Sequence, residues 1–214
     1  MNDVNLRLFR FDYDLTWYTF FLSPGERVYG RYGGRDPKSC DARLSVAGFK
    51  NTMKLVLDEH KRSKADDPPP SPVAFRREPF QTNQRGCVHC HQVWEGQRRE
   101  ARANGTFDEQ SLFVYPLPEN VGLTLSVDEG NRVTAVAPNT PAAKGGLRAG
   151  DILETIHRTK IFSQGDVMAA LDGAPPVGTI TLTYRRAGRA TAVELELPKG
   201  WKKTDLSWRP SMVK

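Results

Sequence analysis

The 214-residue chain is poor in cysteine and has neither a long apolar run nor a dense block of positive charge. Three cysteines, an odd number, exclude a framework in which every cysteine pairs within the chain. No stretch approaches the roughly 18 apolar residues of a transmembrane helix, and the first residues carry Asp and Arg where a secretory signal needs an apolar core. The net charge of +6 is spread over both ends, whereas nucleic-acid surfaces gather basic residues in one stripe. We therefore expect no transmembrane segment and no nucleic-acid partner.

Motifs of hydrolytic enzymes are also missing from the sequence. The chain has no GxSxG run and only four histidines, and a Ser-His-Asp site requires a scaffold for which the sequence leaves no room. We therefore expect no protease activity, and the sequence favours a protein without an enzyme site. With 26% charged and 38% hydrophobic residues, the composition is that of a globular protein.

Proline marks the points at which the chain divides. Residues 64–72, KADDPPPSP, hold four prolines without apolar periodicity, which is typical of an extended linker, and a second seam lies at YPLPE, 115–119. The predicted fold class is α+β in several domains. These are a hairpin and helix unit over 1–63, a linker and a short, mostly helical or irregular segment over 64–114, a β-barrel-like domain over 115–199 and an aromatic tail over 200–214.

The first unit has the pattern of a β-hairpin followed by a helix. TWYTFFL at 16–22 is β-branched and aromatic, SPGE supplies a turn, and RVYGRY at 27–32 predicts the returning strand. Apolar residues at three- and four-residue steps predict a helix over 45–62. Its expected buried face is made of Val46, Phe49, Met53, Val56, Leu57 and His60. This order resembles the second half of a thioredoxin-like domain, without that fold's CxxC pair, and Cys40 is expected to be a bystander.

The strongest chemical signal is CVHCH at residues 87–91. Cys-x-x-Cys-His is the spacing of covalent haem attachment, in which two thiols bond the porphyrin vinyl groups and the following histidine ligates iron. The resemblance is to cytochromes c, and it implies haem c with thioethers at Cys87 and Cys90 and His91 as the proximal ligand. For the sixth ligand we favour Met212, which follows a proline in the tail. The other candidates are Met53, Met168, His60, His157 or no protein ligand.

Two other uses of the same residues remain open. Zinc would use the CxxC pair and His91, although a structural zinc site needs four ligands and no second ligand pair follows in the sequence. A redox dithiol would use Cys87 and Cys90 as the exchanging pair. A polar helix is predicted over 92–103, where arginines face either haem propionates or solvent: Arg98, Arg99 and Arg102. The apolar residues expected to cover a porphyrin are Phe75, Phe80, Val93, Trp94, Phe107, Leu112 and Phe113.

The segment 115–199 carries the most extensive motif. VGLTL and RVTAV predict two strands, and TPAAKGGLRAGDIL at 140–153 predicts a short helix and a further strand. The run resembles PDZ domains of the bacterial, protease-associated type, a family that binds an extended partner as an added strand. The resemblance implies peptide-binding residues on the first strand and on a facing helix at 164–171, the helical ones being equally suited to a core. They are Val121, Gly122, Leu123, Thr124, Leu125, Val167, Met168 and Leu171.

Together these motifs predict a c-type haem protein that acts in electron transfer or redox sensing and docks a protein partner through a PDZ module. The first alternative is a non-enzymatic PDZ adaptor whose CxxCH holds zinc or staples a loop, and the second is a thiol oxidoreductase. Haem attachment of this kind takes place outside the bacterial cytoplasm, so we expect a periplasmic location, with a missing N-terminus to explain the absent signal. The aromatic tail is expected to fold back over the haem segment.

Overall fold

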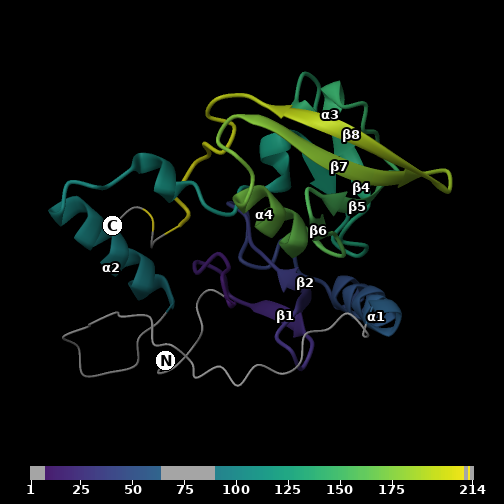
Figure 1. The fold of residues 1–214 in the computed structure, drawn as a ribbon, viewed down its shortest axis with the longest axis horizontal. Coiled ribbons are helices and arrows are strands. Elements are labelled where there is room, and N and C mark those ends of the chain that lie inside the picture. The colour runs from purple at the N-terminus through teal and green to yellow at the C-terminus, as the bar shows by residue number, and fades with distance from the viewer. Residues whose placement is uncertain (1–7, 64–89, 210–211, 213–214) are drawn as a thin grey trace.

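A computed structural model describes residues 8–63, 90–209 and 212 (Figure 1), and the side chains of Cys90 and His91 lie outside that description. The described part mixes helices and strands, as expected. The strands are β1 Tyr18–Leu22, β2 Val28–Gly33, β3 Leu123–Leu125, β4 Val133–Val136, β5 Ile152–Ile156, β6 Thr159–Lys160, β7 Gly178–Arg186 and β8 Arg189–Leu197. The helices are α1 Val46–Ser63, α2 Cys90–Ala103, α3 Pro141–Lys144 and α4 Gln164–Asp172, with 3-10 turns η2 Glu109–Leu112 and η3 Pro118–Val121.

The N-terminal unit is an antiparallel hairpin, β1 with β2, covered by α1. Its elements lie within two residues of the predicted ones. Gly33, the last residue of β2, pairs with Tyr18 at the open end of the hairpin; its φ is 130°, and a Cβ there would lie 2.5 Å from the carbonyl oxygen of Trp17. Only glycine accepts both this positive φ and this close approach of the Trp17 carbonyl. The likeness of this unit to a thioredoxin domain stays a prediction.

The predicted buried face of α1 is wrong in part. Val46, Met53 and Leu57 are 72%, 46% and 52% exposed. The helix turns another face inward, made of Gly48, Thr52, Val56 and Glu59. The reason is that its neighbour is polar backbone: a Cβ on Gly48 would lie 2.2 Å from the carbonyl oxygen of Val127. Close approach to that backbone selects small and hydrogen-bonding residues over the largest apolar ones.

The C-terminal part, residues 115–201, holds the main hydrophobic core, and we call it the β domain. Its strands form two sheets, β3 with β4 and the order β6-β5-β7-β8. The core residues come from both sheets and from α3 and α4: Val121, Leu123, Leu125, Val133, Ala142, Leu147, Leu153, Ile156, Ile161, Val167, Ala170, Leu171, Ala174, Ile180, Leu182, Tyr184, Leu195, Leu197 and Trp201. The strands expected at 121–125 and 132–136 are β3 and β4, and both contribute residues to this core.

Asp151, in the GD pair of the predicted motif, has a structural task. Its carboxylate accepts from the N–H of Arg148 at 2.8 Å and from both Nε and Nη2 of Arg186 at 2.7 and 2.8 Å. Burial acts to raise the pKa of Asp151, but the hydrogen bonds and charge of Arg186 outweigh it and lower that pKa. The pair ties the loop before β5 to the end of β7.

The hairpin and the β domain share a buried ionic contact. Asp166 of α4 accepts from the N–H of Arg31 in β2 at 2.8 Å and from the N–H of Phe162 at 3.1 Å, and the Arg31 guanidinium lies 3.7 Å away. Burial is the largest cause that raises the pKa of Asp166, to about 7. Figure 1 shows the hairpin lying against α4. The described part of the N-terminal unit, residues 8–63, is therefore packed on the β domain.

The described residues of the tail, 200–209 and 212, run from the β domain to α2. Trp201 belongs to the main core, and its Nε1 donates to the carbonyl of Pro175 at 2.9 Å. Farther along, Arg209 pairs with Asp12 at 2.9 Å. The sulfur of Met212 accepts from Nη1 of Arg98 at 3.2 Å. Met212 of the tail thus contacts α2, the helix that begins at Cys90. The sequence predicted that the tail folds back toward this segment.

Candidate functional site

Strand β3 presents one backbone edge to β4 and the other to helix α4. The carbonyl of Gly122 accepts from the N–H of Ala137, and the N–H of Ser126 donates toward the returning chain, both at 2.9 Å. Because backbone groups of an antiparallel strand alternate between its two edges, Leu123 and Leu125 direct theirs away from β4. The edge that faces α4 is therefore the one to which a partner strand can add.

Helix α4 begins with a polar side chain that reaches this edge. Ser163 and Asp166 form a reciprocal capping box at the start of the helix. The next residue after the cap, Gln164, places Nε2 3.4 Å from the carbonyl oxygens of Leu125 and Ser126. A side chain thus stands where the backbone N–H of an added strand would bind.

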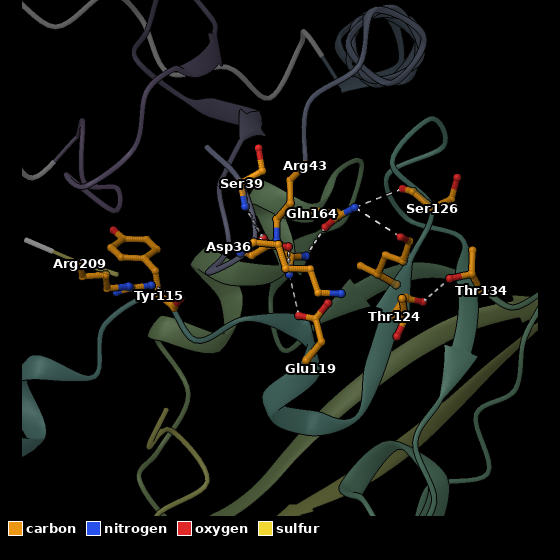
Figure 2. A network of polar contacts seen from close by, with 12 residues as sticks. Asp36, Ser39, Arg43, Tyr115, Glu119, Thr124, Ser126, Thr134, Gln164 and Arg209 are labelled. Atoms are coloured by element: carbon orange, nitrogen blue, oxygen red, sulfur yellow. Dashed lines mark hydrogen bonds and ion pairs between the residues drawn. The ribbon is translucent and has the colours of Figure 1, made fainter. Parts of the chain in front are cut away.

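Arg43, from the loop between β2 and α1, spans the gap between α4 and η3 (Figure 2). Its Nη1 donates to Oε1 of Gln164, and its Nη2 donates to Oε2 of Glu119 at 2.8 Å. A second carboxylate, Asp36, lies 3.6 Å from the same Nη2. The Arg43 side chain is only 5% exposed. We call Arg43, Gln164 and Glu119 the Arg43 latch, because together they bridge α4 and η3 beside β3.

The apolar side of α4 next to the latch is covered as well. Met168 of α4 is buried and clusters with Tyr115 and Leu117, which precede η3. From the other side, a Cβ added to Gly34 would lie 3.4 Å from the Met168 sulfur. Segments from both sides of the linker therefore cover the helix face that a peptide side chain would contact.

Eight residues are nominated by the sequence for peptide binding, and one of these, Met168, lies outside the main core, in the cluster with Tyr115 and Leu117. Thr124 is exposed on β3, and the other seven are buried: Val121, Gly122, Leu123, Leu125, Val167, Met168 and Leu171. Val167 and Leu171 lie in the main core, as the alternative interpretation of the helix allowed. Peptide binding by these residues stays a prediction.

Gly122, expected to admit a peptide carboxylate, is also required by packing. It has φ 90°, and a Cβ there would lie 2.0 Å from Oγ1 of Thr140. That hydroxyl accepts from the N–H of Ala143 and so caps α3. The glycine therefore lets the turn after η3 approach the start of α3.

The three residues of the latch were missed by sequence reasoning. Arg43 lies in a loop without periodicity, and 121 residues separate it from Gln164. Gln164 directly follows Ser163, a residue type that caps helices, and this position was a weak indication of a role at the start of the helix. The sequence prediction for this helix rested on its apolar residues alone. No local pattern indicated Glu119 as the partner of a distant arginine.

The structure leaves the haem motif untested. Cys87 lies outside the described residues, and Cys90 and His91 begin α2 without a description of their side chains. The favoured sixth ligand, Met212, is buried, and its sulfur faces Arg98 in the same helix. Thioether attachment and iron ligation at these residues stay predictions.

Two other candidate ligands, His60 and His157, lie on different elements. Nδ1 of His60 is 3.0 Å from the Tyr29 hydroxyl, and His157 occupies the turn between β5 and β6 at φ 53°. Cys40 is an exposed free thiol. Within residues 8–63, 90–209 and 212, no group of three or more His, Cys, Asp or Glu is placed to hold a metal ion. In the same ranges, no helix combines the length and apolarity needed to cross a bilayer.

A pocket of about 610 Å³ lies along α2. One wall is the helix, and the others are the N-terminal segment and the turn around η2. The lining residues are Arg10, Tyr13, Val93, Trp94, Gln97, Arg98, Ala101, Thr106, Phe107, Asp108, Ser111 and Val114. Three of them, Val93, Trp94 and Phe107, belong to the set predicted to cover a porphyrin.

Comparison with known proteins identifies one part of the chain. The family model of the PDZ domain matches residues 119–197. The serine protease Do-like HtrA of Lactococcus lactis is 34% identical over 77 residues, which are 36% of this chain and 19% of that protein. The periplasmic serine endoprotease DegP of Salmonella typhimurium is 37% identical over 92 residues, 42% of this chain and 19% of that protein.

A solved structure, the serine endoprotease from Yersinia pestis, is 29% identical with a TM-score of 0.33, covering 36% of this chain and 28% of that one. The chain spans about a fifth of the length of the two curated relatives. The family model and the two curated relatives together identify residues 119–197 as a PDZ domain similar to those of HtrA and DegP proteases, which confirms the resemblance for that part of the chain.

Proposed function

We propose that the PDZ domain docks an extended segment of a partner protein in a groove between β3 and α4. The Arg43 latch keeps this groove closed until the partner displaces it. One observation carries the proposal. The edge of β3 that faces α4 is bonded by the Gln164 side chain, which a peptide backbone can replace. Relatives that are named periplasmic support a periplasmic site of action.

The chemistry of docking follows from the backbone of β3. A partner strand would bond the free N–H and C=O groups of Leu123 and the N–H of Leu125. It would have to displace Gln164 from Leu125 and lift Arg43 from the groove. Because a peptide binds only the open fraction of molecules, the latch lowers the apparent affinity by that fraction. The partner's own side chains would then replace the cover that Tyr115 and Leu117 give to Met168.

Opening the latch should increase peptide affinity. We would select C-terminal pentapeptides from a random phage library on the Arg43→Ala variant, and measure their binding to the parent chain by fluorescence anisotropy. We expect binding about tenfold tighter in Arg43→Ala, the size of a modest coupling free energy. Glu119→Gln, which weakens only the ion pair, should give a smaller gain in the same direction. Comparing free-acid and amidated peptides shows whether the terminal carboxylate is recognised.

The control for this experiment is Lys38→Ala, which removes an exposed cation from the same loop. It should bind peptides like the parent chain. Equal affinity of the parent and Arg43→Ala for every selected peptide, with native circular dichroism in both, would show that the latch does not gate the groove. Failure to select any peptide on the opened variant would reject peptide docking itself.

The second candidate function is a c-type haem protein, and the pocket along α2 favours it. That helix begins at Cys90, and its residues Trp94 and Arg98 line the pocket. Bound haem c would supply one-electron redox chemistry. This chain's own residues would hold it covalently through Cys87 and Cys90 and place His91 on the iron, while Trp94 excludes water from the ring.

Haem staining of a denaturing gel tests this candidate. The chain would be expressed with an export signal and c-type maturation proteins. Covalent haem that disappears in Cys87→Ala and Cys90→Ala supports haem c. Colourless protein with one equivalent of zinc would support the zinc alternative, and a dithiol that cycles with glutathione would support the thiol oxidoreductase.

A further inference from the structure

We propose that the pocket along α2 binds a flat aromatic ligand that bears a carboxylate, and that Arg98 forms the ion pair with that carboxylate. The proposal is independent of the peptide groove. It deepens the haem candidate, because a haem propionate is one source of such a carboxylate; a free aromatic acid is the other.

Arg98 is the observation from which the proposal starts. Its side chain lines the pocket, and the residue is 6% exposed. Nη1 donates to the sulfur of Met212 at 3.2 Å, and a thioether is a weak acceptor. Nε and Nη2 are buried and have no hydrogen-bond partner. A buried guanidinium with two unsatisfied donors is costly, so the site is incomplete without an anion.

The two unpartnered nitrogens select the shape of the anion. Nε–H and Nη2–H leave the same edge of a guanidinium side by side, which matches the two oxygens of a carboxylate. Burial lowers the pKa of Arg98, and the carboxylate of Glu95 opposes that effect through space without hydrogen-bonding to either nitrogen. Both nitrogens are closed off from solvent, so an incoming carboxylate would supply both bonds once the guanidinium turns from Met212 toward the pocket.

Aromatic rings define the rest of the ligand. Tyr13 and Trp94 meet with ring centroids 4.5 Å apart, and Trp94 stacks on Tyr115 at 6.4 Å. Phe107 also lines the pocket, and its ring centroid lies 4.5 Å from the guanidinium carbon of Arg102. Aromatic walls with a few polar groups are typical of pockets for flat small molecules, and a volume of about 610 Å³ is within the usual range for them.

Besides Arg98, the described lining of the pocket includes two other charged residues, Arg10 and Asp108. Arg10 lies at its lining with a 61% exposed side chain and an ion pair to Asp172 at 3.3 Å. Asp108 is the one acidic residue among the lining residues that the structure describes, and its carboxylate already caps η2 by accepting from Gln110 at 2.9 Å. Because Arg10 is already paired with Asp172, Arg98 is the cation of the described lining that an anionic ligand would meet.

The test uses ligand pairs that differ only in the carboxylate. The full chain with Cys87→Ser and Cys90→Ser, which cannot form thioethers, would be titrated with haemin and with haemin dimethyl ester, followed by absorbance. We expect haemin to bind about tenfold more tightly than its ester, since charge-assisted hydrogen bonds are worth that much or more. Naphthalene-2-carboxylate and its carboxamide form a second pair, which reports a free aromatic acid as the source.

Substitution of Arg98 assigns the preference to that residue. In Arg98→Met the acid and the ester should bind equally, and Arg98→Lys should keep part of the preference. Arg99→Met, which removes an exposed arginine from the same helix, should behave like the parent. Native circular dichroism and an unchanged melting temperature in Arg98→Lys guard against loss of the fold.

Two outcomes would overturn the proposal. One is equal affinity of the parent for acid and neutral partner in both ligand pairs, or no binding at all. The other is an Arg98→Met variant that keeps the parent's preference. The result is separable from the haem candidate, because haemin binding in the serine variant does not depend on covalent attachment, whereas the gel stain does.

Discussion

At the scale of single residues, the buried charges of this protein decide how its segments meet. Asp166, Arg43 and Arg98 are each nearly inaccessible to solvent. Asp166 is satisfied by backbone N–H groups and Arg31, whereas Arg43 bonds Glu119 and Gln164 through its terminal nitrogens and keeps one buried nitrogen, Nε, without a partner. Arg98 alone of these three keeps two donors without partners. Buried charge is costly unless it is paired, so each of these residues identifies a contact or a binding site.

Asp166 predicts how stability changes with pH. Its pKa is about 7 in the folded chain and 3.8 in its ordinary state. Between those values the folded state binds more protons than the unfolded state, so the free energy of unfolding should fall as pH rises from about 4 to 7. Asp12, whose burial raises its pKa to about 6, adds to the same trend at the lower pH values.

Urea unfolding at pH 4.5, 5.5, 6.5 and 7.5 measures this dependence. Asp166→Asn keeps the side-chain size without the titration, and it should flatten the curve above pH 6. Asp128→Asn, an exposed aspartate, should leave the slope of the parent unchanged. A slope in Asp166→Asn equal to that of the parent would contradict the assignment.

At the scale of elements, α1 shows how packing overrides apolar periodicity. The helix presents Gly48 and Thr52 to the turn after β3, and Asn51 donates to the carbonyl of Glu129 at 3.0 Å. On its last turns, Glu59 is paired with Lys160 of β6. The docking face of α1 is therefore small and polar.

This packing predicts opposite effects for two glycine substitutions. Gly48→Ala should destabilise the chain by about 1–3 kcal/mol, because the clash with the Val127 carbonyl outweighs the better helix propensity of alanine. Gly173→Ala should be neutral or stabilise by up to about 1 kcal/mol, since φ is −74° and the nearest atom is 3.6 Å from its Cβ. Chemical denaturation of both variants checks the two signs, and a neutral Gly48→Ala would refute this account of α1.

At the scale of the whole molecule, segments from both ends of the chain meet in one buried ion pair. Arg209 of the tail and Asp12 of the N-terminal segment are each 1% exposed, and Arg209 also donates to the carbonyls of Val114 and Tyr115 at 2.7 and 3.2 Å. The tail thereby joins the N-terminal segment to the chain that leads into η3. Arg209 therefore connects the tail to the N-terminal segment and to the residues that lead into the PDZ domain.

Removal of this arginine should weaken the whole molecule. Arg209→Met leaves the buried Asp12 carboxylate unpaired, and we expect a loss of about 3–5 kcal/mol at pH 8. The loss should be smaller at pH 5, where Asp12, with its raised pKa, is largely neutral. Thermal unfolding at both pH values measures it. Asp12→Asn combined with Arg209→Met should recover part of the stability, and a loss that is the same at pH 5 and pH 8 would count against this explanation.

The sequence alone determined the local elements and the PDZ domain. Alternating apolar residues, turn residues and capping serines act on neighbours within a few positions, so the hairpin, α1, α2, α4 and the strands at 121–125 and 132–136 were predictable from periodicity and motif. Only the tertiary structure decided which face of α1 is buried, that Arg43 bridges Gln164 and Glu119 beside β3, and that Arg98 lines a pocket. These features depend on pairs of residues far apart in the chain, and such pairs leave no local pattern, because polar side chains find their partners only when packing removes them from water.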